Sequence, residues 1–185
     1  MRQHEYFMKT AIHLANLAGR RGEVPIGSII VRQNDFKIIG YGYNFTENMN
    51  CSVEHAEVRA IRNASVNLKS WRLNSHGEVT LYTTIEPCMM CLGASKLSRI
   101  NTVVYGAKNQ KFGSTKTVDT ANDDIEIIGG ILEHECKLPL QIFFKNKRND
   151  KNNKKKKNDN MRCKGGTNTK EKKERSTECG GAEEE

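Results

Sequence analysis

The sequence predicts an α/β fold, a three-layer α/β/α sandwich in which helices cover both faces of a five-stranded mixed sheet. Three observations predict it: an apolar helical period near the N-terminus, five short segments rich in β-forming residues, and an alternation of helix and strand in the middle of the chain. A chain of 185 residues is long enough for one such domain and a further segment. We predict the domain at residues 1–148 and the further segment at residues 149–185.

The first elements are a helix and a β-hairpin. A helix ending at Gly19 is expected because five small or apolar residues recur at helical spacing: Phe7, Ala11, Leu14, Ala15 and Ala18. Strands are expected at residues 27–31 (GSIIV) and 37–44 (KIIGYGYN), and the RQND between them is typical of a hairpin turn. A second helix is expected over residues 54–69.

The later elements alternate between strand and helix. VTLYTTI at residues 79–85 predicts a buried strand, and a helix is expected to begin at Pro87, because proline suits the first helical position. TVVYG and IEII predict two more strands. A last helix is expected from about residue 130, and Pro139 within it should kink or split it.

Most of the positive charge lies in the C-terminal part of the chain. Residues 146–175 carry thirteen Lys and Arg against four Asp and Glu, whereas residues 1–145 carry seventeen against fourteen. The Lys/Asn-rich run has no apolar period and cannot bury a core, so residues 149–185 are predicted to be disordered. Its lysines are either a solvated tail or a nonspecific attraction for phosphate.

The cysteines and the hydropathy favour a cytoplasmic protein. The six cysteines show no regular spacing, which argues against a disulfide framework and for thiols or metal ligands. The polar start MRQHEYFMKT does not resemble a secretory leader. No apolar run approaches the ~18 residues that span a membrane, so we expect no membrane contact.

Two short motifs bring together the residues of a metal site. VEHAEV contains His55 and Glu57 at the start of the second helix, and EPCMMC places Cys88 and Cys91 at the start of the third. Residues three apart on a helix share a face, so both sulfurs can bind one ion, with His55 as the candidate third ligand. One His and two Cys leave the fourth zinc position open to water, as in catalytic zinc sites. Zinc lowers the pKa of such a water, and Glu57 can reach it.

The cysteine pair also fits a structural zinc site or a redox couple. A structural site would need four protein ligands, and a redox couple would not need the His-Ala-Glu motif. Cys51, just before the second helix, is predicted to be a loop thiol, because a fourth protein ligand would close the site to water. A catalytic zinc site is therefore the preferred interpretation.

His-x-Glu followed by Pro-Cys-x-x-Cys is the signature of zinc deaminases. Over residues 4–148 the sequence resembles the bacterial-type tRNA-specific adenosine deaminases of the zinc-dependent cytidine and deoxycytidylate deaminase superfamily, through VPIGSIIV, GYGYN, HAEVRAIRNA, TLYTTIEPCMMCLGA and SRINTVVYGAKNQKFG. The resemblance implies a cytidine-deaminase-like fold and hydrolytic deamination of adenosine to inosine at the wobble position of a tRNA anticodon. It implies one Zn²⁺ per subunit, bound by His55, Cys88 and Cys91, with zinc-activated water and Glu57 as the proton shuttle.

The resemblance also implies which residues bind the substrate. Asn44 would hydrogen-bond the flipped nucleotide, Asn109 would lie near the RNA backbone, and Phe144 of the last helix would support the pocket. The base pocket would be lined by Val24, Pro25, Ile26 and the backbone of Ala56. From the residues alone, Asn44 could also be a turn residue after a strand, and Phe144 a residue at the end of a core helix.

The partners implied by the resemblance are a tRNA anticodon stem-loop and a second subunit. The second subunit would form a homodimer, or a heterodimer if the source is eukaryotic. The sequence departs from the family at the substrate rim. Asn109 stands where the family has Asp, which removes a charge that would repel phosphate, and NCSVEH replaces the family's Asp-Pro-Thr lead into the histidine.

A deaminase of free nucleobases or nucleosides (guanine, cytosine or cytidine) is the alternative, because the same zinc core serves all of them. The pyrimidine-deaminase domain of riboflavin synthesis usually has a wider spacing between its cysteines. A catalytically inactive RNA-binding subunit should have lost the glutamate, and Glu57 is present. The segment from Ser98 to Gly106 and the basic, aromatic last helix favour tRNA.

Overall fold

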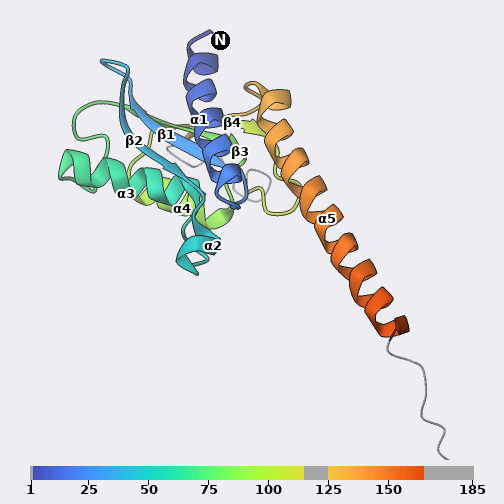
Figure 1. The fold of residues 1–185 in the computed structure, drawn as a ribbon. Coiled ribbons are helices and arrows are strands. Elements are labelled where there is room, and N and C mark those ends of the chain that lie inside the picture. The colour runs from blue at the N-terminus through green and yellow to red at the C-terminus, as the bar shows by residue number, and fades with distance from the viewer. Residues whose placement is uncertain (1, 115–124, 165–185) are drawn as a thin grey trace, which may run out of the picture. The chain divides into compact units, whose positions relative to one another are not determined.

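The structure, a computed structural model, describes residues 2–114 and 125–164 and has the predicted α/β architecture (Figure 1). In chain order the elements are α1 (Arg2–Arg20), β1 (Gly27–Arg32), β2 (Lys37–Tyr43), α2 (Thr46–Met49), α3 (Ala56–Leu68), β3 (Val79–Ile85), α4 (Met89–Leu97), β4 (Thr102–Ala107), β5 (Glu126–Ile128) and α5 (Glu133–Lys164). None of the helices within the described ranges has the length and apolarity needed to cross a bilayer.

The sheet has five strands in the order β2-β1-β3-β4-β5. β1 pairs antiparallel with both β2 and β3, whereas β3, β4 and β5 run parallel to one another. Parallel neighbours need a crossover connection, and α4 supplies the one between β3 and β4. The five-stranded mixed sheet predicted from the sequence is confirmed.

Apolar side chains of the strands pack on both faces of the sheet. Leu81 and Val103 belong to a buried cluster with residues of α3 and α4. The next residues along each strand, Tyr82 and Val104, belong to a second cluster with residues of α1 and with Cys136 of α5. Because successive strand residues point to opposite faces, α3 and α4 cover one face of the sheet and α1 and α5 cover the other. The predicted three-layer α/β/α sandwich is confirmed.

This arrangement of layers puts the usual ligand-binding position of α/β proteins at the carboxyl ends of β3 and β4. The chain leaves β3 toward α4 on one face, and after β4 and β5 it enters α5 on the opposite face. Ligands of α/β proteins bind where neighbouring connections depart toward opposite faces. Cys88 follows β3 and Asn109 follows β4 at this edge.

The first helix ends later than the sequence predicts. α1 continues through Gly19 to Arg20, and the left-handed backbone falls on Gly22, at φ 80°. The N–H of Glu23 donates to the carbonyl oxygen of Ala18 over 3.1 Å, which closes the helix as a Schellman motif. The prediction that Gly19 stops the helix is therefore wrong, because the glycine that the cap requires lies three residues further on.

Two elements near the metal-site motifs also differ from the prediction. α4 begins at Met89 rather than at Pro87, which leaves Cys88 as the N-cap residue. The four-residue helix α2 has no counterpart among the predicted elements. Its backbone is held by a side chain from a distant segment, described below, so no local pattern predicts it.

The last helix differs most from the prediction. Pro139 lies inside α5, which is one element from Glu133 to Lys164, so the helix is not split. A proline inside a helix removes one backbone hydrogen bond, and the kink expected at this position stays a prediction. Residues 149–164 are helical where the sequence predicted disorder. Helical hydrogen bonds are local, so a helix that has already formed over residues 133–148 can continue into this stretch without a core of its own.

The chain divides into two compact units, Met1–Lys147 and Arg148–Glu185. The predicted tail beyond residue 164 lies outside the described residues. The assignment of residues 1–148 to one deaminase domain stays a prediction. All the site residues discussed below belong to the first unit.

Candidate active site

Two helix N-termini meet at the carboxyl edge of the sheet. His55 is the N-cap residue of α3 and Cys88 is the N-cap residue of α4, and both have an extended backbone. β2 and α3 pack closely at Gly42, where an added Cβ would lie 2.3 Å from the carbonyl oxygen of Ala56. The absence of a side chain at Gly42 therefore sets how near the start of α3 lies to the sheet.

The ligand atoms of His55, Cys88 and Cys91 form one group. Nδ1 of His55 lies 3.8 Å from Sγ of Cys88 and 3.4 Å from Sγ of Cys91, and the three atoms lie within 4.8 Å of one another. A tetrahedral zinc with Zn–S near 2.3 Å and Zn–N near 2.0 Å separates nitrogen from sulfur by about 3.5 Å and the two sulfurs by about 3.8 Å. The three side chains therefore fit one zinc ion.

A zinc ion in this group would keep an open fourth position. Among the described residues, no fourth His, Cys, Asp or Glu joins the group, and Cys51 lies outside it. Glu57 is 3% exposed and lines the adjoining cavity. Burial raises the pKa of Glu57, so its carboxyl group exchanges a proton nearer to neutral pH than an exposed one does.

The two thiols hold one proton between them in the metal-free chain. Hydrogen bonds from Cys91 and His55 lower the pKa of Cys88 to about 4. The hydrogen bond to Cys88, together with burial, raises the pKa of Cys91 far above its ordinary value. The hydrogen bond with Cys88 also raises the pKa of His55. A divalent metal that binds both sulfurs must therefore displace the Cys91 proton.

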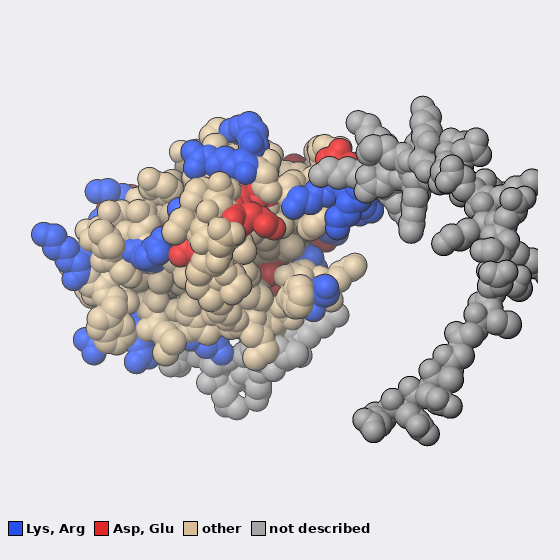
Figure 2. Space-filling model, turned by 60° about the horizontal axis from the view of Figure 1, so that its bottom comes forward, with Lys and Arg blue, Asp and Glu red and all other residues tan. Residues whose placement is uncertain are grey.

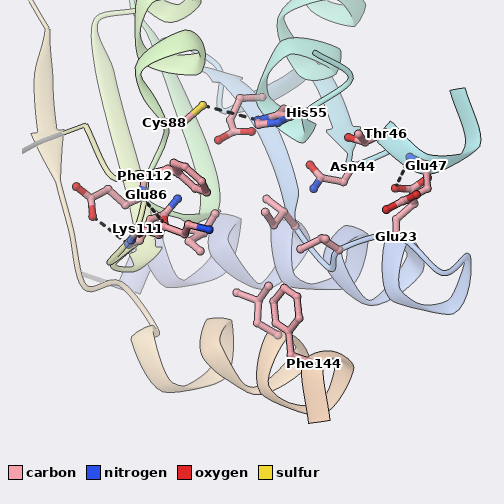
Figure 3. Close-up of a pocket in the computed structure, with 16 residues that line it drawn as sticks. Glu23, Asn44, Thr46, Glu47, His55, Glu86, Cys88, Lys111, Phe112 and Phe144 are labelled. Atoms are coloured by element: carbon pink, nitrogen blue, oxygen red, sulfur yellow. Dashed lines mark hydrogen bonds between the residues drawn. The ribbon is translucent and has the colours of Figure 1, made fainter. Parts of the chain in front are cut away.

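A cavity of about 630 Å³ opens beside the metal group. Figure 3 shows Cys88 and His55 on one side of it and Phe144, from α5, on the opposite side. Five of the predicted substrate residues line the cavity: Val24, Ile26, Asn44, Asn109 and Phe144. Its volume lies within the range of about 300–1,000 Å³ that is usual for small-molecule sites.

Two predicted pocket residues lie elsewhere. Pro25 lines a separate cavity of about 240 Å³ between α1 and α5. Neighbouring residues of an extended segment point in opposite directions, so Pro25 faces away from the cavity that Val24 and Ile26 line. Ala56 is fully buried and does not line the cavity, although its backbone contacts a residue that does.

Asn44 connects the cavity wall to the start of α3. Its Oδ1 accepts a hydrogen bond from the N–H of Ala56 over 2.9 Å, and the residue is buried. Because a backbone N–H must face an oxygen, this contact fixes the orientation of the side-chain amide. The Nδ2 group is then the part of Asn44 that can donate to a ligand in the cavity.

Asn109 closes a turn after β4. Its Oδ1 accepts hydrogen bonds from the N–H of Phe112 over 3.0 Å and from the N–H of Lys111 over 3.3 Å. Its own N–H donates to Glu86 over 3.0 Å. The side-chain oxygen of Asn109 is therefore engaged within the turn, and Nδ2 is the group that can face a ligand.

The cavity wall contains an anchor that the sequence did not reveal. Glu23 is 1% exposed and accepts hydrogen bonds from the N–H of Glu47 over 3.1 Å and from the N–H and side-chain amide of Asn48 over 2.9 and 2.7 Å. Burial alone raises the pKa of Glu23, but the hydrogen bonds from Asn48, Glu47 and Thr46 outweigh it and lower the pKa overall. Glu23 thereby ties α2 to the wall that begins at Val24.

Other lining residues were also not predicted: Thr46, Glu47, Ile85, Glu86, Lys111, Phe112 and Leu140. The only sequence signal for Lys111 and Phe112 is their place in GAKNQKFG, after the fourth strand. Leu140 precedes Phe144 by one helical turn, and this spacing puts both on one face of α5.

Comparisons with known proteins agree with this geometry. Residues 1–107 match the family described as the cytidine and deoxycytidylate deaminase zinc-binding region. A tRNA-specific adenosine deaminase of Streptococcus pyogenes serotype M18 is 38% identical over 159 residues, which cover 83% of this chain and 97% of the relative. A solved structure from work on A-to-I editing by tRNA:A34 deaminases at the wobble position of transfer RNA is 34% identical, with a TM-score of 0.66 over 73% of this chain and 99% of that one. A guanine deaminase from Nitrosomonas europaea is similar in fold, with 22% identity and a TM-score of 0.69 over 75% of this chain and 83% of that one.

Proposed function

Because the chain belongs to the family of tRNA-specific adenosine deaminases, we propose that it converts adenosine to inosine at the wobble position of a tRNA anticodon. The observation that carries this proposal is the three-residue His-Cys-Cys group at the wall of a cavity that also contains a buried glutamate. This combination supports hydrolysis by an open zinc site rather than a structural or redox role.

The metal ligands are His55, Cys88 and Cys91, with one Zn²⁺ per subunit. When bound, zinc supplies a Lewis acid that lowers the pKa of a water molecule toward neutrality. The N-termini of α3 and α4 both point at this place, and their partial positive charge favours thiolates and developing negative charge there.

Glu57 is the proton shuttle. It accepts the two protons of the attacking water in turn: the first, taken as the oxygen attacks C6 of the adenine ring, goes to ring N1, and the second, taken from the new C6 hydroxyl, goes to the leaving amine. Adenosine and water thereby give inosine and ammonia. Burial supports this role, because it raises the pKa of Glu57 toward the range in which a carboxyl group both accepts and donates.

The base is held by the walls of the 630 Å³ cavity. Nδ2 of Asn44 donates to the flipped nucleotide, and its orientation is set by the contact with Ala56. Val24 and Ile26 pack against the ring, and Phe144 covers the side opposite to the metal group. Asn109 contacts the substrate through its amide rather than through its engaged oxygen.

An anticodon loop suits this site because its bases are unpaired and can leave their stack at low cost. Figure 2 shows one face of the molecule, with Lys and Arg side chains along its margin and Asp and Glu side chains near the middle. Lys111 lines the cavity itself. Cationic side chains on the same face attract phosphate, and this attraction should weaken as salt is added.

The functional protein is a homodimer in the cytoplasm, or a heterodimer with a related chain if the source is eukaryotic. Large apolar side chains exposed on α3 and α4 support a subunit interface, with Val66 69%, Met89 65% and Leu97 76% exposed. Sedimentation equilibrium of the purified chain tests this directly. A mass of one chain at micromolar concentration would contradict the homodimer.

The substrate is tested by a panel of matched compounds. Zinc-loaded protein is incubated with an anticodon stem-loop that carries adenosine at the wobble position, and separately with free guanine, cytosine and cytidine. We expect inosine in the stem-loop and no ammonia from the free compounds. Ammonia from a free base or nucleoside, with no inosine in RNA, would replace the proposal by the small-molecule alternative.

A further inference from the structure

The segment that leads into His55 departs from the family pattern. In the structure, ion pairs within the chain hold this segment in place. Glu54 immediately precedes His55 and is 7% exposed. Two arginines of α3 bind its carboxylate, Nη1 of Arg59 at 2.6 Å and Nη1 of Arg62 at 3.1 Å. We call these three residues, Glu54, Arg59 and Arg62, the arginine clamp.

Arg59 is held more firmly than Arg62. Its guanidinium carbon lies 4.8 Å from the ring centroid of Phe45 and 5.6 Å from that of Tyr43, both within the distance of a cation–π contact. Its side chain is 22% exposed, against 61% for Arg62. Ion pairs at exposed positions contribute little, so Arg59 carries most of the clamp.

Two clamp residues also make backbone hydrogen bonds on either side of His55, the metal ligand. The carbonyl oxygen of Glu54 accepts from the N–H of Phe45 over 3.0 Å, and the N–H of Arg59 donates to the carbonyl oxygen of His55 over 3.0 Å. Between these two bonds lies the contact from Ala56 to Asn44. The segments 43–45 and 54–59 therefore form one unit that carries both His55 and Asn44.

His55 has little side-chain support of its own. Its Nδ1 faces the two sulfurs, and within the described part of the chain its Nε2 has no hydrogen-bond partner. Metal-binding histidines are usually oriented by a partner on the second ring nitrogen, whose loss weakens metal affinity by about 10–100-fold. The orientation of His55 depends instead on its backbone, and the clamp holds that backbone.

We propose that the arginine clamp is the positioning element of the zinc site. It fixes the backbone at His55, so that the ring meets the metal, and through Phe45 it keeps the Asn44 amide in place relative to the metal. Its three residues neither line the cavity nor join the metal group. The inference rests on the zinc site of the proposed function and not on its RNA substrate. Zinc binding is therefore measured without RNA.

Three variants of the full-length chain test the proposal. Arg59→Met removes the charge and keeps much of the side-chain volume. Arg59→Lys keeps a cation within reach of Glu54 and the two rings. Arg62→Met, the matched control, removes the exposed ion pair to the same carboxylate. Zinc affinity is measured by competition with a chromophoric chelator, ligand geometry by the visible absorption of Co²⁺-loaded protein, and folding of the metal-free chain by circular dichroism.

We expect Arg59→Met to weaken zinc affinity by about 10–100-fold and to change the Co²⁺ bands. Arg59→Lys should recover most of this loss, and Arg62→Met should weaken affinity by at most about fivefold, as for an exposed ion pair. If Arg59→Met does not fold, Glu54→Gln makes the same test, because it removes the charge that Arg59 binds and should reproduce the loss of affinity.

Native zinc affinity and native Co²⁺ bands in Arg59→Met, or in Glu54→Gln where that variant replaces it, would overturn the proposal. An equal loss in Arg59→Met and Arg62→Met would also overturn it, because it would assign the effect to net charge rather than to the held side chain. Failure of the stem-loop assay with the expected zinc affinities would count against the substrate and leave the clamp supported.

Discussion

The metal end of the cavity and its outer rim are built differently. At the metal end, His55 and Cys88 are the N-caps of helices that start next to core strands, and Glu57 is buried. At the rim, Phe112 is 62% exposed and Phe144 is 43% exposed. Buried backbone contacts thus determine the chemistry, whereas exposed side chains determine what reaches it. Changes at the metal end should therefore affect turnover, and changes at the rim should affect binding.

The largest expected effect comes from Glu57. Glu57→Gln keeps the shape of the side chain but cannot carry protons, so kcat should fall by about 10²–10⁴-fold. Zinc content, measured by atomic absorption, should not change, because Glu57 is outside the group of ligand atoms. A variant that retains more than a tenth of native kcat would break the assignment of chemistry to the metal end.

The second prediction concerns the charge of Cys88 in the metal-free chain. Its pKa of about 4 makes it a thiolate throughout pH 6–8. Its alkylation by iodoacetamide should therefore be nearly independent of pH in this range, whereas the rate for an ordinary thiol of pKa about 8.5 rises roughly tenfold per pH unit below the pKa. Mass spectrometry of the modified peptide gives the rates. Zinc should protect Cys88, and a tenfold rise per unit in the metal-free chain would contradict the prediction.

The third prediction concerns the anchor between the two regions, Glu23. Its native pKa is lowered, so the carboxylate stabilises the fold above the unfolded pKa of about 4.3, and this stabilisation is lost as pH falls through the native pKa. Glu23→Gln should lower the free energy of unfolding by about 1.5–3 kcal/mol at pH 7, the range for hydrogen bonds to a charged group. The difference, measured by urea unfolding, should shrink at pH 3. An equal difference at both pH values would contradict the account.

The smallest expected effect belongs to the rim. Phe144→Ala removes an exposed ring from the cavity wall. It should raise KM for the stem-loop about fivefold with little change in kcat, which corresponds to about 1 kcal/mol, the lower end of the range for base stacking. Phe143→Ala is the control, because Phe143 lines the separate cavity with Pro25. A fall in kcat without a rise in KM in Phe144→Ala would contradict the assignment of turnover to the metal end and of binding to the rim.

The metal end was also the part most fully predicted from the sequence. The strand at residues 79–85 was predicted with its observed bounds, because it is a run rich in β-forming residues that is buried on both faces. The metal ligands lie at or near helix starts, His55 at one and the cysteine pair at another. Helix starts have local sequence signals, so these positions could be predicted. The family resemblance drawn from these motifs is confirmed by the comparisons.

The rim was predicted less well because its geometry depends on distant contacts. α2 is held by Glu23, more than twenty residues earlier in the chain, so no local pattern identifies it. Asn109 was expected to lie near the RNA backbone, but the sequence did not reveal that the turn it closes engages its side-chain oxygen. Pro25 was grouped with Val24 and Ile26, and only the observed backbone separates them between two cavities.

The central claim is that this zinc site acts on adenosine within an anticodon loop. The most direct measurement follows inosine and ammonia together, with zinc-loaded protein and a stem-loop whose only unpaired adenosine is at the wobble position. The account predicts one inosine per ammonia released, a rate that falls as salt is raised, and rates of both products at least about 100-fold lower with Glu57→Gln. Ammonia without inosine, or inosine formed by the Glu57→Gln variant at more than a tenth of the native rate, would contradict it.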